Sequence, residues 1–242
     1  MITTANLWHT IRAEVEAAAR EEPMLASFLH LTVLRHDSLA HVLAFHLSSK
    51  LSSSTMDARA LYETFLHVLQ HHPDITRAVE SDITACYERD PACDAYSLPL
   101  LYFKGFHAIQ THRINHALWR QERKTLAYFL QNRASEVFGV DIHPGAKFGC
   151  GIMFDHGTGI VIGETAVLGN NISLLHGVTL GGSGKESGDR HPKIGAGSVV
   201  VRDVEPQTTV VGVPAKAVGL SKNTPAADMD QSLLCDDFIY VI

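Results

Sequence analysis

The sequence predicts an α+β chain in which an N-terminal α-helical bundle is followed by a parallel β-helix of hexapeptide repeats and a flexible C-terminal tail. Two observations predict this fold class. Apolar residues recur at intervals of three and four up to about residue 139, which is typical of amphipathic helices. After Gly139 they recur every six residues, which fits neither a helix nor an isolated alternating strand. The expected boundaries are 1–139 for the helices, 140–220 for the β-helix and 221–242 for the tail.

The composition is that of a globular protein rather than of a membrane or nucleic-acid-binding protein. Apolar residues make up 45% and charged residues 19% of the 242 residues. The net charge of −6 argues against a general nucleic-acid binder, and no apolar run is long enough to span a membrane. The N-terminus lacks the basic start and apolar block of a secretion signal. Four cysteines without CxxC spacing favour reduced thiols, so the expected location is the cytoplasm.

The helical half contains recognisable helix ends. Pro23 is expected to open a helix, because proline is tolerated in a first turn. Thr55 or Asp57 is a candidate N-cap for the next segment, which should end at His72-Pro73. Gly139 is a candidate C-cap for the last helix.

The repeat half keeps its six-residue period through seven positions and resumes it at Ile194 and Val200. These seven positions are Ile142, Phe148, Phe154, Ile160, Ala166, Ile172 and Val178. Three hexapeptides make one triangular coil, with the apolar residue inside the prism and small residues at the corners. Nine hexapeptides predict three complete coils. The interruption at 179–193 is rich in glycine, and a long excursion from a repeat is more often functional than accidental.

Two histidine pairs in the helical half have a spacing that metal ligands use. His67 and His71 are four residues apart, as are His112 and His116. Neither pair is completed in sequence by an Asp or Glu, so no metal is expected there. Histidines on a helix face or at a subunit contact explain the spacing as well.

The hexapeptide repeat alone is shared by acyltransferases and γ-class carbonic anhydrases, and longer strings separate the two. "RDPACDAYSLPLLYFKGFHAIQTHRI", "DIHPGAKFGCGIMFDHGTGIVIGETAVLG" and "VTLGGSGKESGDRHPKIGAGSVV" resemble bacterial serine O-acetyltransferase. The resemblance covers nearly the whole chain. It implies a left-handed β-helix, paired trimers forming a hexamer, and acetylation of L-serine by acetyl-CoA on the route to cysteine. His143, His156 and His176 could suggest the carbonic anhydrase zinc site, but their spacings of 13 and 20 do not resemble it.

The resemblance also assigns catalytic roles. The serine hydroxyl is a poor nucleophile at neutral pH, so its attack on a thioester needs a general base. His156 is that base by resemblance, and Asp141 is the carboxylate that orients it. The two residues are 15 positions apart, close to one coil, so they are expected to meet on adjacent rungs. No covalent enzyme intermediate is expected.

The substrate residues are carried over in the same way. Asp90 and Asp155 are expected to hold the serine ammonium group, and Arg190 and His191 its carboxylate. The acetyl-CoA site is expected to use a further set of glycines, small residues and lysines. This set is Gly181, Gly182, Ser183, Lys185, Ala196 and Lys216. A glycine turn and solvated lysines are the alternative interpretation of these residues.

The chain departs from the family where "RHPKI" runs directly into "GAGSVV". Family members usually carry more coil here, and the absence amounts to roughly four hexapeptides. Four is not a multiple of three, so the following rungs would change face unless the loop absorbs the difference. Two functions remain open: an active serine O-acetyltransferase with a compressed coenzyme site, and a catalytically weakened partner of O-acetylserine sulfhydrylase.

The tail provides the expected contact with that partner. In the family a terminal isoleucine inserts into the sulfhydrylase active site, and this chain ends in Ile242. The last residues are more apolar than is usual for the family, and a disordered C-terminus is the alternative. L-Cysteine is the expected feedback inhibitor. The chain is expected to form a homo-oligomer, either a trimer or a dimer of trimers.

Overall fold

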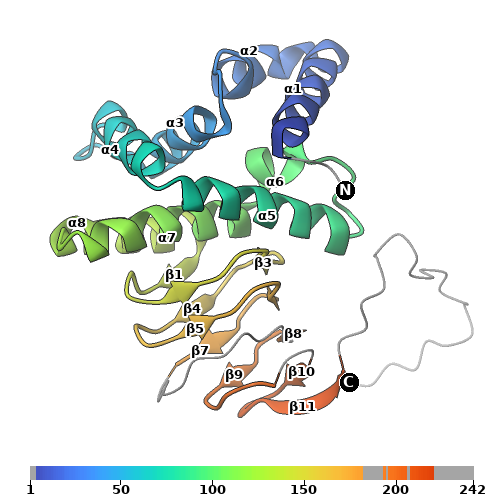
Figure 1. The fold of residues 1–242 in the computed structure, drawn as a ribbon, viewed down its shortest axis with the longest axis vertical. Coiled ribbons are helices and arrows are strands. Elements are labelled where there is room, and N and C mark those ends of the chain that lie inside the picture. The colour runs from blue at the N-terminus through green and yellow to red at the C-terminus, as the bar shows by residue number, and fades with distance from the viewer. Residues whose placement is uncertain (1–3, 182–192, 195, 206–207, 221–242) are drawn as a thin grey trace, which may run out of the picture.

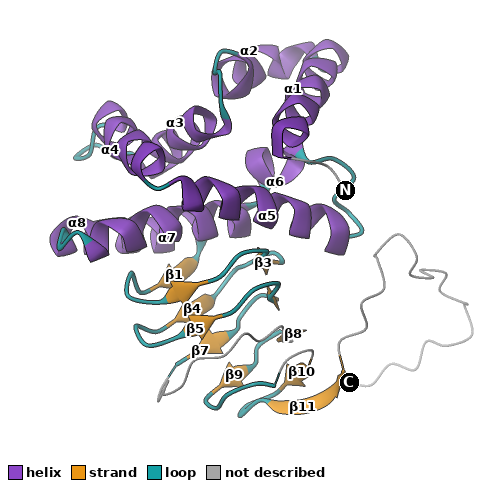
Figure 2. Cartoon of the chain, in the orientation of Figure 1, coloured by secondary structure: helices purple, strands orange, loops and turns teal. Residues whose placement is uncertain are grey.

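The computed structural model describes residues 4–181, 193–194, 196–205 and 208–220. Helices lie at one end of the molecule and a stack of short strands at the other, with α5 and α7 lying across the end of the stack (Figure 1). Helices precede Gly139 and strands follow it (Figure 2), so the predicted fold class is confirmed. Within the described part of the chain, no helix is long and apolar enough to cross a membrane.

The helical part is built from short and medium helices. In chain order they are α1 (Thr4–Glu21), η1 (Pro23–Leu25), α2 (Ala26–Leu29), η2 (His30–Leu34), α3 (Leu39–Leu51), α4 (Ala58–His71), α5 (Pro73–Arg89), α6 (Ser97–Tyr102), α7 (Lys104–Arg120) and α8 (Lys124–Phe138). Their ends follow the local signals. Pro23 and Pro73 each occupy the first helical position, where the missing N–H costs nothing. Gly139 caps α8 with φ +69°, a left-handed conformation that glycine adopts without strain.

Asp57 is the N-cap of α4, which decides between the two candidates. Its Oδ1 accepts hydrogen bonds from the backbone N–H groups of Arg59 (3.0 Å) and Ala60 (3.1 Å). These two N–H groups have no partner inside the helix, so the carboxylate satisfies donors that would otherwise be left to water. Thr55 instead lies in the preceding turn, where its hydroxyl contacts Ser53.

The strands form three faces of a prism. They are β1 (Val140–Ile142), β2 (Lys147–Phe148), β3 (Met153–Phe154), β4 (Ile160–Ile162), β5 (Val167–Leu168), β6 (Ser173–Leu174), β7 (Thr179–Leu180), β8 (Lys193–Ile194), β9 (Val199–Val200), β10 (Thr208–Val211) and β11 (Lys216–Leu220). The first face is β1-β4-β7-β9, the second β2-β5 and the third β3-β6-β8-β10. All of these pairs are parallel, and β11 closes the third face antiparallel to β10. In the first two turns of the chain, each face therefore takes one short strand from each turn.

The first coil is two residues longer than the sequence period predicts. Asp141 pairs with Val161, twenty residues later, whereas Val161 pairs with Thr179 after eighteen. The inward-facing Ala146 and Ile152 are six residues apart, but eight residues separate Ile152 from the equivalent Ile160. The constant period of six is therefore wrong at this one corner. Phe154 and Ile160 are both buried and six residues apart, so the apolar residues of the sequence keep a period of six although the coil contains two extra residues.

The chain regains its register after the loop. Leu174 pairs with Ile194 and Thr179 pairs with Val199, so β8 and β9 lie directly on β6 and β7. The shortened sequence therefore does not move β8 and β9 to other faces of the prism. Where three complete coils were expected, the described residues form strands on all three faces in two coils. The first and third faces continue to four rungs.

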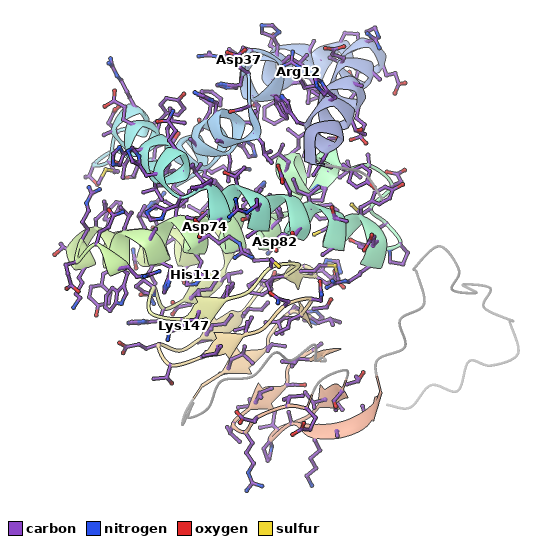
Figure 3. The ribbon with its side chains drawn as sticks, in the orientation of Figure 1. Arg12, Asp37, Asp74, Asp82, His112 and Lys147 are labelled. Carbon is purple, nitrogen blue, oxygen red and sulfur yellow. The ribbon has the colours of Figure 1, made fainter. Side chains whose placement is uncertain are left out.

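A buried ion pair joins the helices to the first coil. Asp82 of α5 is fully buried and accepts from Arg113 of α7 through two nitrogens, Nε (3.0 Å) and Nη2 (2.8 Å). Gln110 Nε2 and the backbone N–H of Ile152 also donate to this carboxylate, at 2.9 and 2.8 Å. Asp82 and His112 are labelled where the helices meet the strands (Figure 3). A buried charge with this many donors holds one arrangement of the two parts.

Candidate active site

His156 lies in the widened corner of the first coil. It follows β3, and its backbone adopts a positive φ of +58°, which is uncommon for a residue with a side chain. Its side chain is 77% exposed, and Nε2 lies 3.7 Å from Oδ1 of Asp155, whose side chain is 33% exposed. The ring centroid of His176 lies 6.3 Å away, at the same corner one coil later. The two extra residues thus present an imidazole and a carboxylate at the surface of the prism.

The glycines beside His156 allow this corner to form against α7. Gly157 and Gly159 have φ values of +71° and +75°, where a side chain is strained. A Cβ on Gly157 would lie 3.1 Å from Cα of Gly105, in the first turn of α7. Nζ of Lys104 contacts the Thr158 hydroxyl beside it. The small residues therefore let the helix rest directly on the corner that carries His156.

Asp141 is held by the helical part rather than by His156. It lies in β1, half-buried, and its Oδ1 accepts a hydrogen bond of 2.7 Å from Nε2 of Gln131 in α8. Among the residues that the structure describes, no hydrogen bond joins Asp141 to His156. The closest carboxylate contact of His156 is Asp155. Gln131 is thus a residue at the site that sequence reasoning missed, because no spacing rule links it to a strand ten positions later.

Asp90 lies at the opposite end of α5 from the proline that opens it. It is the C-cap of the helix, half-buried, with its backbone N–H donating to the Cys86 carbonyl. Its Oδ1 accepts from the backbone N–H of Ala92 at 2.9 Å. This local bond fixes the side chain in the turn and leaves the second carboxylate oxygen without a bond to the described residues.

The remaining predicted site residues are divided between described and undescribed segments. Gly181 follows β7 and is half-buried, while Ala196 and Lys216 are exposed further along the prism. The others lie outside the described residues: Gly182, Ser183, Lys185, Arg190, His191 and Ile242. The structure therefore brings together Asp155 and His156 and fixes Asp90 and Asp141 separately.

The helix histidines with metal-ligand spacing have structural partners. His112 is buried, and its Nε2 donates to the Ala146 carbonyl at 3.1 Å, while Nδ1 of His116 donates to the Pro144 carbonyl at 2.8 Å. These bonds join α7 to the corner after β1, and burial holds the pKa of His112 well below its usual value. His143 in the same corner packs against the rings of Trp119 and Tyr128. No group of three His, Cys, Asp or Glu side chains suited to a metal occurs within the described ranges.

A second buried pair, His46 and His107, lies inside the helical part. Their ring centroids are 5.0 Å apart. Nε2 of His46 donates to the Leu101 carbonyl at 3.3 Å, and Nε2 of His107 to the Leu100 carbonyl at 2.9 Å. Burial lowers the pKa of His46 to about 4 and that of His107 to about 3. Both rings are therefore neutral at physiological pH and belong to the core.

Known proteins match this chain over nearly its whole length. A family model described as the N-terminal part of serine acetyltransferase matches residues 7–111. Serine acetyltransferase of Escherichia coli strain K12 is 49% identical over 250 aligned positions, covering 93% of this chain and 92% of that protein. The chain belongs to the serine acetyltransferase family. Because the aligned span exceeds the 242 residues of this chain, the E. coli protein carries residues that this chain lacks.

Solved structures of serine acetyltransferases share this fold. The crystal structure from Neisseria gonorrhoeae is 65% identical with a TM-score of 0.81, covering 96% of this chain and 98% of that one. A serine acetyltransferase in complex with cysteine is 46% identical with a TM-score of 0.83, covering 96% and 100%. The Brucella abortus strain S19 enzyme in complex with coenzyme A is 44% identical with a TM-score of 0.79, covering 90% and 97%. One of these relatives was thus crystallised with cysteine and another with coenzyme A, each on the fold that this chain shares.

Proposed function

We propose that this member of the family transfers the acetyl group of acetyl-CoA to the hydroxyl of L-serine, giving O-acetylserine and CoA. The observation that carries the proposal is the match to serine acetyltransferases over more than nine tenths of the chain. The exposed imidazole of His156 in the widened corner supports it. The alternative of a weakened scaffold partner is not favoured by these comparisons. The pairing of β8 with β6 and of β9 with β7 also answers the concern that the later rungs change face.

The proposed reaction is a direct transfer. His156 takes the proton of the serine hydroxyl as Oγ attacks the thioester carbonyl carbon. The tetrahedral intermediate then collapses, the C–S bond breaks, and the CoA thiolate receives the proton from the imidazolium. Asp141 is the orienting carboxylate: Gln131 holds its Oδ1, and Oδ2 is the atom offered to His156.

The substrate contacts follow the family assignment. Asp155, beside His156, and Asp90, fixed in its turn, are proposed to hold the serine ammonium group. Arg190 and His191 are proposed to bind the serine carboxylate. L-Cysteine carries the same ammonium and carboxylate groups as serine, and a family member has been crystallised with it. Competitive inhibition by L-cysteine at the serine site is therefore part of the proposal.

The coenzyme and partner sites are also proposals. A complex of the Brucella abortus enzyme with coenzyme A supports acetyl-CoA as the second substrate. Gly181, Gly182, Ser183, Lys185, Ala196 and Lys216 are the proposed contacts. Ile242 is the proposed anchor for O-acetylserine sulfhydrylase. A homo-oligomer, trimer or dimer of trimers, is the proposed assembly.

Thiol release from acetyl-CoA in the presence of L-serine tests the activity directly. The full-length protein should release CoA only when both substrates are present, and L-cysteine should raise the apparent KM for serine without lowering the maximal rate. Absence of serine-dependent CoA release from a folded oligomer would reject the proposed function.

A further inference from the structure

Arg89, the last residue of α5, connects the helical part to two rungs of the β-helix. Its Nη1 donates to the Gly151 carbonyl at 3.0 Å and to the Ser173 hydroxyl at 3.4 Å, and its Nη2 donates to Oδ1 of Asn171 at 3.0 Å. Gly151 belongs to the first coil, and Asn171 and Ser173 belong to the second. One guanidinium group therefore bridges three acceptors on neighbouring rungs.

The corner that receives Arg89 has a strained backbone shaped for close approach. Gly151 and Asn171 both adopt left-handed conformations, with φ values of +68° and +57°. A Cβ on Gly151 would overlap Oδ1 of Asn171 and would lie 3.5 Å from Nη2 of Arg89. A non-glycine residue at 151 would thus push the amide away from the guanidinium. The left-handed backbone of Asn171 is less favourable than an ordinary conformation, and in this conformation its side chain accepts the hydrogen bond from Arg89.

A second residue of α5 bonds to the same stretch of chain. Asp82 accepts from the N–H of Ile152, and Arg89, seven residues later on the same helix, donates to the carbonyl of Gly151. Residues seven apart lie on one face of a helix. The C-terminal half of α5 is therefore bonded to the two residues that precede β3, and β3 leads to Asp155 three residues after Ile152.

The residue after Arg89 is Asp90, the proposed ligand of the serine ammonium group. The bond from Ala92 fixes the Asp90 side chain within its own turn, but that turn follows the helix and moves with it. Within the described residues, the contacts of Arg89 are the nearest in sequence to Asp90 that tie it to the β-helix.

We propose that Arg89 is a positioning residue of the serine site, which holds the Asp90 carboxylate at a fixed place relative to the coil that carries Asp155 and His156. The inference rests on the proposed function. A displacement of about 1 Å is enough to weaken catalysis strongly, because bound groups must meet the substrate in one geometry. Loss of the bridge should therefore weaken serine binding and leave acetyl-CoA binding almost unaffected, because Gly181, Ala196 and Lys216 of the proposed coenzyme set are not among the acceptors of Arg89.

Steady-state kinetics of the full-length oligomer, with each substrate varied in turn, test the inference. Arg89→Ala should raise the KM for serine about tenfold, the effect expected for one charged hydrogen bond, while the KM for acetyl-CoA stays within about twofold. Arg89→Lys keeps the charge and should recover part of the loss, because a single ammonium cannot reach all three acceptors. Arg77→Ala, an exposed arginine of the same helix, is the matched control and should change neither constant.

Asn171→Ala tests the bridge from the other side. It should raise the KM for serine less than Arg89→Ala does, and the double variant should be no worse than Arg89→Ala alone, because coupled residues are not additive. The inference is overturned if Arg89→Ala behaves like Arg77→Ala. It is also overturned if the two KM values rise by the same factor with a lower Tm, which would indicate only general loosening.

A binding measurement separates this inference from the proposed function. Calorimetric titration with L-serine, without acetyl-CoA, should show weaker binding to Arg89→Ala than to the parent protein. If the parent binds serine without turning it over, the proposed reaction fails while the role of Arg89 is still tested by this comparison. Equal affinity in both proteins would reject the role of Arg89.

Discussion

The histidines of the helices and those of the β-helix corner have opposite surroundings. His107 and His112 are buried, each donates Nε2–H to a backbone carbonyl, and burial lowers the pKa of both. His156 is largely exposed in a left-handed corner beside a carboxylate, and His176 is exposed at the same corner one coil later. The first pair supports packing, whereas the rings of the second pair are accessible at the surface of the prism. The same side chain therefore serves structure or chemistry according to what surrounds it.

The strongest test of this comparison is the removal of His156. His156→Ala should lower the rate of serine-dependent CoA release by at least about a hundredfold, the usual contribution of a general base. The free energy of unfolding should change by less than about 0.5 kcal/mol, because the side chain is exposed. Unchanged turnover in the variant would remove His156 from the mechanism.

The buried pair His46 and His107 should make stability depend on pH. Their folded pKa values, about 4 and about 3, lie below that of an unfolded histidine. The unfolded chain therefore binds more protons, and the stability present above about pH 6.5 is lost as the pH falls toward those folded values.

Denaturant titrations at pH 7.5 and pH 5.5 measure this loss, which we expect to be about 3 kcal/mol for His46 and His107 together, with buried His112 adding to it in the same direction. His107→Phe should reduce the difference by about 1 kcal/mol, the share of one titrating group. If the parent protein is equally stable at both pH values, the buried pair does not stay neutral in the folded state.

Gln131 tests whether the helical part contributes to the chemistry at the corner. Gln131→Ala removes the hydrogen bond to Asp141 and should lower kcat by about tenfold, with little change in either KM. Asn132→Ala is the matched control, since its side chain bonds only to Glu136 on the exposed side of α8. A kcat equal to that of the control would show that Asp141 needs no support from α8.

The smallest effect is expected at His176. Its ring lies close to His156 and is exposed, but no role in the reaction is assigned to it. His176→Ala should leave kcat and both KM values within about threefold of the parent, as for an ordinary surface substitution. A loss comparable to that of His156→Ala would mean that the pair, rather than His156 alone, handles the proton.

Much of the fold was predictable because it depends on local periods. The change from helical spacing to a six-residue repeat, the glycine cap at 139 and the prolines at 23 and 73 are short-range signals, and all were confirmed. The extra two residues at the His156 corner were not predictable, because both Met153 and Phe154 of β3 are apolar and buried. Phe154 and Ile160 keep the six-residue count although they occupy different positions in the coil.

The sequence predicted proximity of site residues only where they are neighbours within one motif. Asp155 and His156 are neighbours in the sequence and in space. Gln131 and Arg89 contact residues of the prism that are distant in the sequence, and the amino-acid sequence contains no spacing that links them to these partners. The expected meeting of Asp141 and His156 stays a prediction, because in this single chain the carboxylate is bound to α8 instead. The number of hexapeptides in the sequence suggested that the strands after the loop could change face. The parallel pairing of β8 with β6 and of β9 with β7 shows that they keep their faces.

The loop between β7 and β8 has a consequence for how such proteins change over time. The strands beyond the loop pair in register with those before it, and each repeat contacts only its neighbours. The number of repeats at the far end of the prism can therefore change without altering the earlier coils. The corner that carries His156 belongs to the first coil, where two extra residues of its own set its shape, so changes at the far end leave it in place.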